Sequence, residues 1–268
     1  MIPLIFFLSG CSGIKFQDPV SSTTIISKSD LISGKALFGE RAMKLSLPDD
    51  GVMELNEKML SYLDNYVPRN YGEGAKVRNI MRMMIGQGLL GMEYNMSKTY
   101  TAWEAFQKAE GNCLSFSYLF TAFAKNRGLK VRFQEVDIPP QWDQIADDLY
   151  YFSRHVNVRI FLREDHDIVV DIDRINFKPH YRVWQITENE AVALYYSNTG
   201  TDYLYKNDYE NAFRYLVKAL QLAPKDAALW SNLGVLYRMK GVFNYAEKAY
   251  FIALKYDSQQ RSALSNLS

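Results

Sequence analysis

Cysteine and histidine are scarce in this chain, and their scarcity narrows the chemistry that it can perform. The 268 residues contain two cysteines, Cys11 and Cys113, and three histidines, His155, His166 and His180. No histidine has a cysteine near it in sequence, so the spacing of a zinc site is missing. A glycine-rich phosphate loop is missing as well. We therefore expect neither a metal nor a cofactor.

An excess of charge of either sign is also missing. Lysine and arginine number 31, aspartate and glutamate number 30, and the formal net charge is +1, with no basic stripe along the chain. This balance gives no reason to expect a nucleic-acid partner. Hydrophobic residues make up 48% of the sequence, which is enough for a full core and one small additional domain.

Cys113 stands where a loop gives way to a strongly apolar helix. Residues 113–127 are apolar on most of the helix circumference, which is typical of a central buried helix, and Gly128 follows in the usual position after a helix end. A cysteine in the first turn lies at the positive end of the helix dipole, near unpaired N–H groups that favour a thiolate and can hold an oxyanion. Most free cysteines, however, are small buried hydrophobes. The partners of Cys113 must decide between these two interpretations.

His155 is the best candidate for a general base. It lies in a predicted strand, residues 154–162, and alternation places it on the face opposite the core residues Val156, Val158, Ile160 and Leu162. After a charged turn, a second short strand over residues 168–173 carries Asp171 and Asp173 on one face. Two adjacent antiparallel strands can bring the imidazole beside an acid, which would hold one ring nitrogen and leave the other to take the thiol proton.

In this order and spacing, the three groups resemble the transglutaminase-like superfamily of papain-type thiol enzymes, over roughly residues 99–173. The resemblance implies that Cys113 is the nucleophile, His155 the base and Asp171 the orienting acid, with Asp173 as the alternative acid. It also implies an oxyanion donor from a side chain upstream of the cysteine. No motif selects one among the three candidates, which are Tyr100, Trp103 and Gln107.

The predicted fold class is α+β. The cysteine helix and the strands at residues 129–136, 155–162 and 168–173 suggest a papain/transglutaminase-like core, a helix packed on an antiparallel sheet, within a catalytic domain over residues 45–190. Upstream, residues 45–66 and 74–85 have helical spacing, and Thr101 can cap a further helix. Residues 137–153, rich in proline and aromatics, either shape the substrate site or simply pack.

Residues 191–268 contain a repeat with an offset of 34 residues, in which Tyr196, Gly200 and Ala212 match Trp230, Gly234 and Ala246. The pattern resembles tetratricopeptide repeats, which implies an all-α segment of helical hairpins. There are two copies, followed by a short capping helix from residue 261. Because at least three repeats are normally needed for an independent array, a structural buttress and a site for a protein partner both stay open.

The N-terminus resembles a bacterial lipoprotein leader. Residues 2–8 are almost wholly apolar, and Leu8-Ser9-Gly10-Cys11 resembles a lipobox, which implies a signal peptide over residues 1–10 and lipidation of Cys11. A buried strand is the alternative, because the apolar run is too short to span a bilayer. Residues 11–44, which begin with a stretch rich in serine and threonine, would be a tether. With Cys11 lipidated and Cys113 reactive, no disulfide is expected.

These resemblances imply a lipid-anchored thiol enzyme on the periplasmic face of the outer membrane, since Ser12 rather than aspartate follows Cys11. Its substrate would be a peptide or protein, attacked by Cys113 to give a thioester. Hydrolysis would make it a protease or amidase, which is the leading expectation. Transfer to an amine would make it a cross-linking acyltransferase. The third alternative is a non-catalytic scaffold that recruits partners through residues 191–268.

Overall fold

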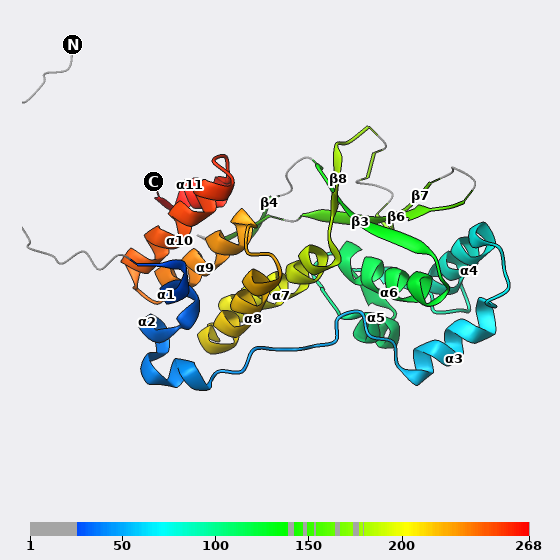
Figure 1. Ribbon diagram of the computed structural model, residues 1–268, viewed down its shortest axis with the longest axis horizontal. Coiled ribbons are helices and arrows are strands. Elements are labelled where there is room, and N and C mark those ends of the chain that lie inside the picture. Colours follow the sequence, from blue (N-terminus) through cyan, green and yellow to red (C-terminus); the bar gives the residue numbers. More distant parts are fainter. Residues whose placement is uncertain are drawn as a thin grey trace, which may run out of the picture.

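The chain combines a small antiparallel sheet, a set of helices around it and a helical C-terminal segment (Figure 1). The computed structural model describes residues 26–138, 142–146, 149–152, 154–163, 167–173, 177–178 and 180–267, with the backbone alone at 142–146 and 149–152. The predicted signal peptide, Cys11 and His166 lie outside these ranges. Within them, every helix is too short or too polar to cross a lipid bilayer.

The main sheet has four strands in the order β7-β6-β3-β8, and every neighbouring pair is antiparallel. The strands are β3 (Lys130–Val136), β6 (His155–Phe161), β7 (Ile168–Val170) and β8 (Val183–Ile186). The pairing of β3 with β6 sets Val136 opposite His155. A separate hairpin, β4 (Trp142–Ala146) and β5 (Leu149–Phe152), lies between β3 and β6 in sequence. The antiparallel sheet was expected from the sequence, but the edge strand β8 was not.

The helix α6 (Cys113–Asn126) packs against β3 and β6, as expected, and is buried from Cys113 to Ala124. One of its contacts with the sheet is an edge-on pair of the rings of Tyr118 and Phe133, whose centroids are 6.1 Å apart. Figure 1 shows α6 between the sheet and α5 (Ala102–Lys108). A core helix that is apolar on nearly all sides fixes its first residue firmly, because no side of the helix can turn toward water at low cost.

Two helices and two short strands that precede α6 in sequence lie near it. The helices α3 (Glu57–Tyr66) and α4 (Glu73–Ile85) flank it, and the two-residue strands β1 (Glu93–Tyr94) and β2 (Glu110–Gly111) pair in parallel. Thr101 caps α5 as predicted: its hydroxyl accepts from the Glu104 N–H at 3.2 Å. The helical spacing at residues 45–66 overestimated α3, which begins only at Glu57. Pro48 and Gly51 lie in the part that is not helical.

The C-terminal segment consists of α7 (Glu188–Tyr205), α8 (Tyr209–Leu222), α9 (Ala227–Met239), α10 (Phe243–Tyr256) and α11 (Arg261–Leu267). The first four helices form two hairpins, α7 with α8 and α9 with α10. In each hairpin a glycine of the first helix faces a large side chain of the second at corresponding positions: Gly200 faces Leu216 and Gly234 faces Tyr250. The repeat in the sequence therefore has a packing cause, which is the close approach of paired helices.

Gly234→Ala is expected to destabilise the α9–α10 hairpin. A Cβ at this position would lie 2.4 Å from Cε1 of Tyr250, whose side chain is buried and cannot move away freely. Overpacking of this kind typically costs about 1–3 kcal/mol of unfolding free energy. Gly74→Ala in α4 is the matched control, because its Cβ would meet only the Arg78 guanidinium at 3.4 Å. Urea unfolding should show a lower free energy of unfolding for Gly234→Ala than for the wild type and no decrease for Gly74→Ala. Equal unfolding midpoints for the two variants would contradict the packing described.

Residues 26–44 correct the predicted tether, because they are folded. They form α1 (Lys28–Ser33), α2 (Lys35–Phe38) and the 3₁₀ helix η1 (Gly39–Lys44), which lie against the C-terminal helices (Figure 1). Leu31 is fully buried, and its carbonyl accepts from the Tyr237 hydroxyl at 2.6 Å. The Phe38 ring packs edge-on against Phe213 at 5.5 Å. A few apolar side chains thus outweigh the polar composition of this stretch.

Candidate active site

The start of α6 is held by a capped turn around Cys113. Asn112 is the N-cap, and its Oδ1 accepts from the Ser115 N–H at 3.1 Å while its Nδ2 donates to Thr99 Oγ1 at 2.7 Å. Gly111 is required by close approach, since a Cβ there would lie 2.5 Å from the Ser115 Cβ. Cys113 is the first helical residue and is only 5% exposed. Its own N–H and that of Leu114 have no acceptor within the helix.

His155 stands between Cys113 and Asp171. Its Nε2 lies 2.7 Å from Asp171 Oδ2, and the ring lies close enough to the Cys113 thiol for the two groups to interact electrostatically. Because Nε2 is engaged with the carboxylate, Nδ1 is the nitrogen left for the sulfur. The ring is 2% exposed. The three residues predicted as a triad are therefore brought together in the predicted order.

The charge state of His155 follows from its two partners. Burial lowers the pKa of the imidazole, but the interactions with Asp171 and Cys113 outweigh burial and raise that pKa from 6.5 to about 10. Below that pH the ring is an imidazolium that can donate at both nitrogens. A protonated ring beside a cysteine stabilises the thiolate, which is the reactive form.

The Asp171 carboxylate is fixed on both oxygens. Oδ2 accepts from Asn157 Nδ2 at 3.1 Å in addition to His155, and Oδ1 accepts from the Asp173 N–H at 2.9 Å. Asp171 follows directly after β7, and β7 pairs with β6 from Val158 to Ile160, so the strand pairing brings Asp171 to His155 and Asn157. A carboxylate bound on both oxygens cannot rotate away from the imidazole without losing several hydrogen bonds.

Asp173, the alternative acid, has a different partner. Its carboxylate lies near the hydroxyl of Tyr94, which is also within electrostatic reach of Cys113 and Asp171. Burial first, and then these negative groups, raise the pKa of Tyr94 above its usual range, so the phenol keeps its proton. Tyr94 is 40% exposed and reaches the site because β1 pairs with β2, with Tyr94 opposite Gly111. Sequence reasoning missed it, since a two-residue strand has no periodicity to detect.

The three residues proposed from the sequence as oxyanion donors have contacts elsewhere. Tyr100 donates its hydroxyl to Glu110 Oε1 at 2.9 Å. Trp103 stacks on Phe106 at 6.0 Å, and the Gln107 side chain is exposed on α5. The unpaired N–H groups at the start of α6 lie nearer the sulfur.

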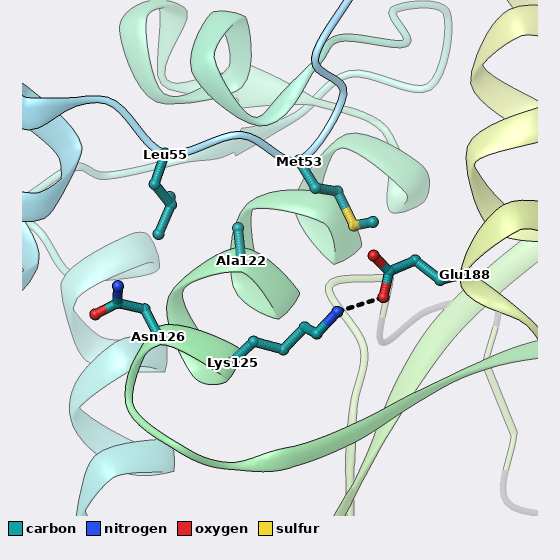
Figure 2. A pocket seen from close by; sticks show the side chains of 6 residues that line it. All are labelled: Met53, Leu55, Ala122, Lys125, Asn126 and Glu188. Atoms are coloured by element: carbon teal, nitrogen blue, oxygen red, sulfur yellow. Dashed lines mark hydrogen bonds and ion pairs between the residues drawn. The ribbon is translucent and has the colours of Figure 1, made fainter.

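A hollow of about 320 Å³ lies at the other end of α6 (Figure 2). Its lining residues are Met53, Leu55, Ala122, Lys125, Asn126 and Glu188. The length of α6 separates it from Cys113, roughly 18 Å at the rise of an α-helix. The Lys125–Glu188 ion pair lies across it, between side chains that are half exposed. The hollow is therefore separate from the Cys113–His155–Asp171 cluster.

No cluster of three or more histidine, cysteine, aspartate or glutamate side chains suited to a metal ion occurs in the part of the chain that the structure describes.

Comparison with known sequences adds little. No family model matches the chain. A curated protein from Guillardia theta, the uncharacterized protein ycf37, is 28% identical over 94 residues, which is 35% of this chain. The chain spans about half the length of that relative, 53%. Function must therefore be argued from the geometry.

Proposed function

We propose that this protein is a transglutaminase-like thiol enzyme that cleaves peptide or carboxamide bonds through Cys113, His155 and Asp171. The observation that carries the proposal is the position of His155, whose ring lies beside the buried Cys113 thiol and is hydrogen-bonded to a fixed carboxylate. A buried cysteine with a purely structural role has no need of such partners. The helical repeats that follow agree with a tetratricopeptide segment attached to this domain.

The first half of the reaction would form a thioester. The Cys113 thiolate adds to the carbonyl carbon, and the carbonyl π electrons move to oxygen. The N–H groups of Cys113 and Leu114 would stabilise the resulting oxyanion at the start of α6. The His155 imidazolium then gives its proton to the nitrogen as the C–N bond breaks, so an amine leaves and the acyl group stays on sulfur.

The second half decides the reaction class. Neutral His155 takes a proton from the incoming nucleophile as it attacks the thioester, and the thiolate leaves. Water as nucleophile gives a carboxylate, which is hydrolysis by a protease or amidase. A primary amine gives a new amide, which is cross-linking. Hydrolysis remains the leading proposal.

A lipid-anchored, periplasmic location, with Cys11 as the attachment point, is part of the same proposal and rests on the lipobox.

The test is a search by intact mass for an acyl adduct on the full chain after exposure to peptidoglycan fragments and envelope proteins. Peptide mapping should place the adduct on Cys113. Repeating the reaction in ¹⁸O-labelled water with an added dansylated alkylamine separates the two classes: hydrolysis leaves ¹⁸O in the product carboxylate, and transfer leaves the dansyl group on the acyl product. A chain that forms no adduct, or one placed only on other residues, would contradict the proposal.

The non-catalytic scaffold receives less support. The C-terminal helices contact the four-stranded sheet and the helix α6 packed on it, which together we call the sheet unit. One such contact is the hydrogen bond from the Tyr118 hydroxyl of α6 to the Ala191 carbonyl at 2.7 Å. These contacts favour a buttress that packs on the catalytic domain. Binding of a partner by the outer helices remains compatible with that role.

A further inference from the structure

The nucleophile and the base are each preceded by a residue that is connected to the C-terminal helices. Asn112 precedes Cys113 and is linked to α7, and Arg154 precedes His155 and is linked to the turn before α9. The two connections share no residue. They join one helical segment to both halves of the reactive pair.

Arg154 connects the base to the helical segment through a largely buried ion-pair network. Its Nε donates to Glu135 Oε1 at 2.6 Å, its Nη2 pairs with the other oxygen of Glu135, and its Nη1 donates to Asp226 Oδ2 at 2.5 Å. The three side chains are 24%, 9% and 16% exposed. Asp226 is also the N-cap of α9, where its Oδ1 accepts from the Ala228 N–H at 2.9 Å. A rigid guanidinium held from both sides fixes the backbone where β6 begins.

Asn198 connects the nucleophile to the same segment. Its Nδ2 donates to Thr99 Oγ1 at 3.0 Å, and this oxygen also accepts from Nδ2 of Asn112, the cap of α6. A further bond, from Asn232 Nδ2 to Ser197 Oγ at 3.0 Å, ties α9 to α7. Displacing the hairpins would therefore disturb the start of α6 and the start of β6 together.

We infer that Asp226 and Asn198 are positioning residues for the proposed thiol chemistry, so that the helical segment regulates the reactivity of Cys113 through its docking on the sheet unit. The inference rests on the proposed function, because it concerns the alignment of Cys113 with His155. Neither residue touches the reacting atoms. Each acts through the neighbour of a reacting residue, and a small shift of one partner is enough to weaken the pair.

The test uses the full chain and follows alkylation of Cys113 by iodoacetamide, quantified by peptide mass, from pH 6.5 to pH 10. Asp226→Asn keeps an N-cap acceptor for α9 but removes the charge that holds Arg154. Asn198→Ala removes the bond to Thr99 and retains helix propensity. For each variant we expect the rate at pH 6.5 to fall about tenfold or more, with the difference vanishing near pH 10. Asp226→Glu, which restores the carboxylate, should recover much of the rate.

Glu188→Gln is the matched control, because Glu188 also joins the helical segment to α6 but pairs with Lys125, at the end of the helix remote from Cys113. The pH profile of Cys113 alkylation in Glu188→Gln should match that of the wild type, and the far-UV circular dichroism spectra of all variants should be the same. Partial unfolding would expose Cys113 and raise the rate at every pH, unlike the expected loss. If Asp226→Asn and Asn198→Ala behave like Glu188→Gln while His155→Ala loses reactivity, the positioning role is wrong and the enzyme proposal stands. If His155→Ala also has no effect, both fail.

Discussion

Cys113→Ala is expected to abolish adduct formation and to lower turnover by as much as about 10⁶-fold, the loss typical of removing a catalytic nucleophile. Alanine fills nearly the same volume at this buried position, so folding should be retained. Cys11→Ser is the matched cysteine control, since Cys11 has no role in the proposed chemistry. Turnover that survives in Cys113→Ala, or is lost in Cys11→Ser, would place the reactive thiol elsewhere.

His155→Ala belongs to the same prediction and tests the base. Without the imidazolium the thiol must ionise unaided, and an ordinary thiol is only about 1% thiolate at pH 6.5. Alkylation of Cys113 should therefore fall by up to about a hundredfold at pH 6.5 and approach the wild-type rate near pH 10. A labelling rate at pH 6.5 equal to that of the wild type would show that His155 is not the base.

Asp171→Asn should lower turnover by about 10²–10⁴-fold. An amide is a weaker acceptor than a carboxylate for the His155 Nε2 proton. It therefore favours neither the imidazolium nor, in the neutral ring, the tautomer protonated at Nε2. Peptide hydrolysis at neutral pH, with circular dichroism to check folding, measures the effect.

Asp173→Asn is the matched control for the loss of turnover expected in Asp171→Asn. Comparing the two variants decides which acid orients the His155 ring. Asp173 donates its backbone N–H to Asp171 Oδ1, a bond that the substitution keeps, and its carboxylate lies near the Tyr94 hydroxyl. We expect its turnover to stay within about tenfold of the wild type. A larger loss for Asp173→Asn than for Asp171→Asn would reverse the assignment.

The sequence predicted that Cys113, His155 and Asp171 lie close together, because the elements around them have clear patterns; their catalytic roles came from the family resemblance and stay a prediction. The apolar run predicted the start of α6, and alternation predicted β6. The strand expected over residues 168–173 is shorter in the structure, since β7 ends at Val170 and Asp171 follows it. Local patterns of this kind carry the information for α-helices and strands, and hence for the residues at their ends. The close contacts of Gly200 and Gly234 were likewise implied by their place in the repeat.

What the sequence did not predict depends on contacts between distant segments. Tyr94 reaches the site only because β1 pairs with β2, and Asn198 meets Thr99 only after α7 docks on the sheet unit. The sequence predicts a tether where residues 28–44 form helices, because only a few residues there, such as Leu31 and Phe38, contribute to the core, too few to give a detectable pattern. No local propensity encodes such pairings.

The most direct test of the central claim is a titration of His155 by ¹⁵N–¹H NMR. The chain has only three histidines, so His155→Gln identifies the signal. An imidazole held between the Cys113 thiol and Asp171 should remain protonated through neutral pH and titrate near 10. In Asp171→Asn and Cys113→Ala, each of which removes one of the two groups that raise the pKa of His155, the midpoint should be lower. A wild-type midpoint near 6.5, unchanged in both variants, would mean that the ring meets neither partner.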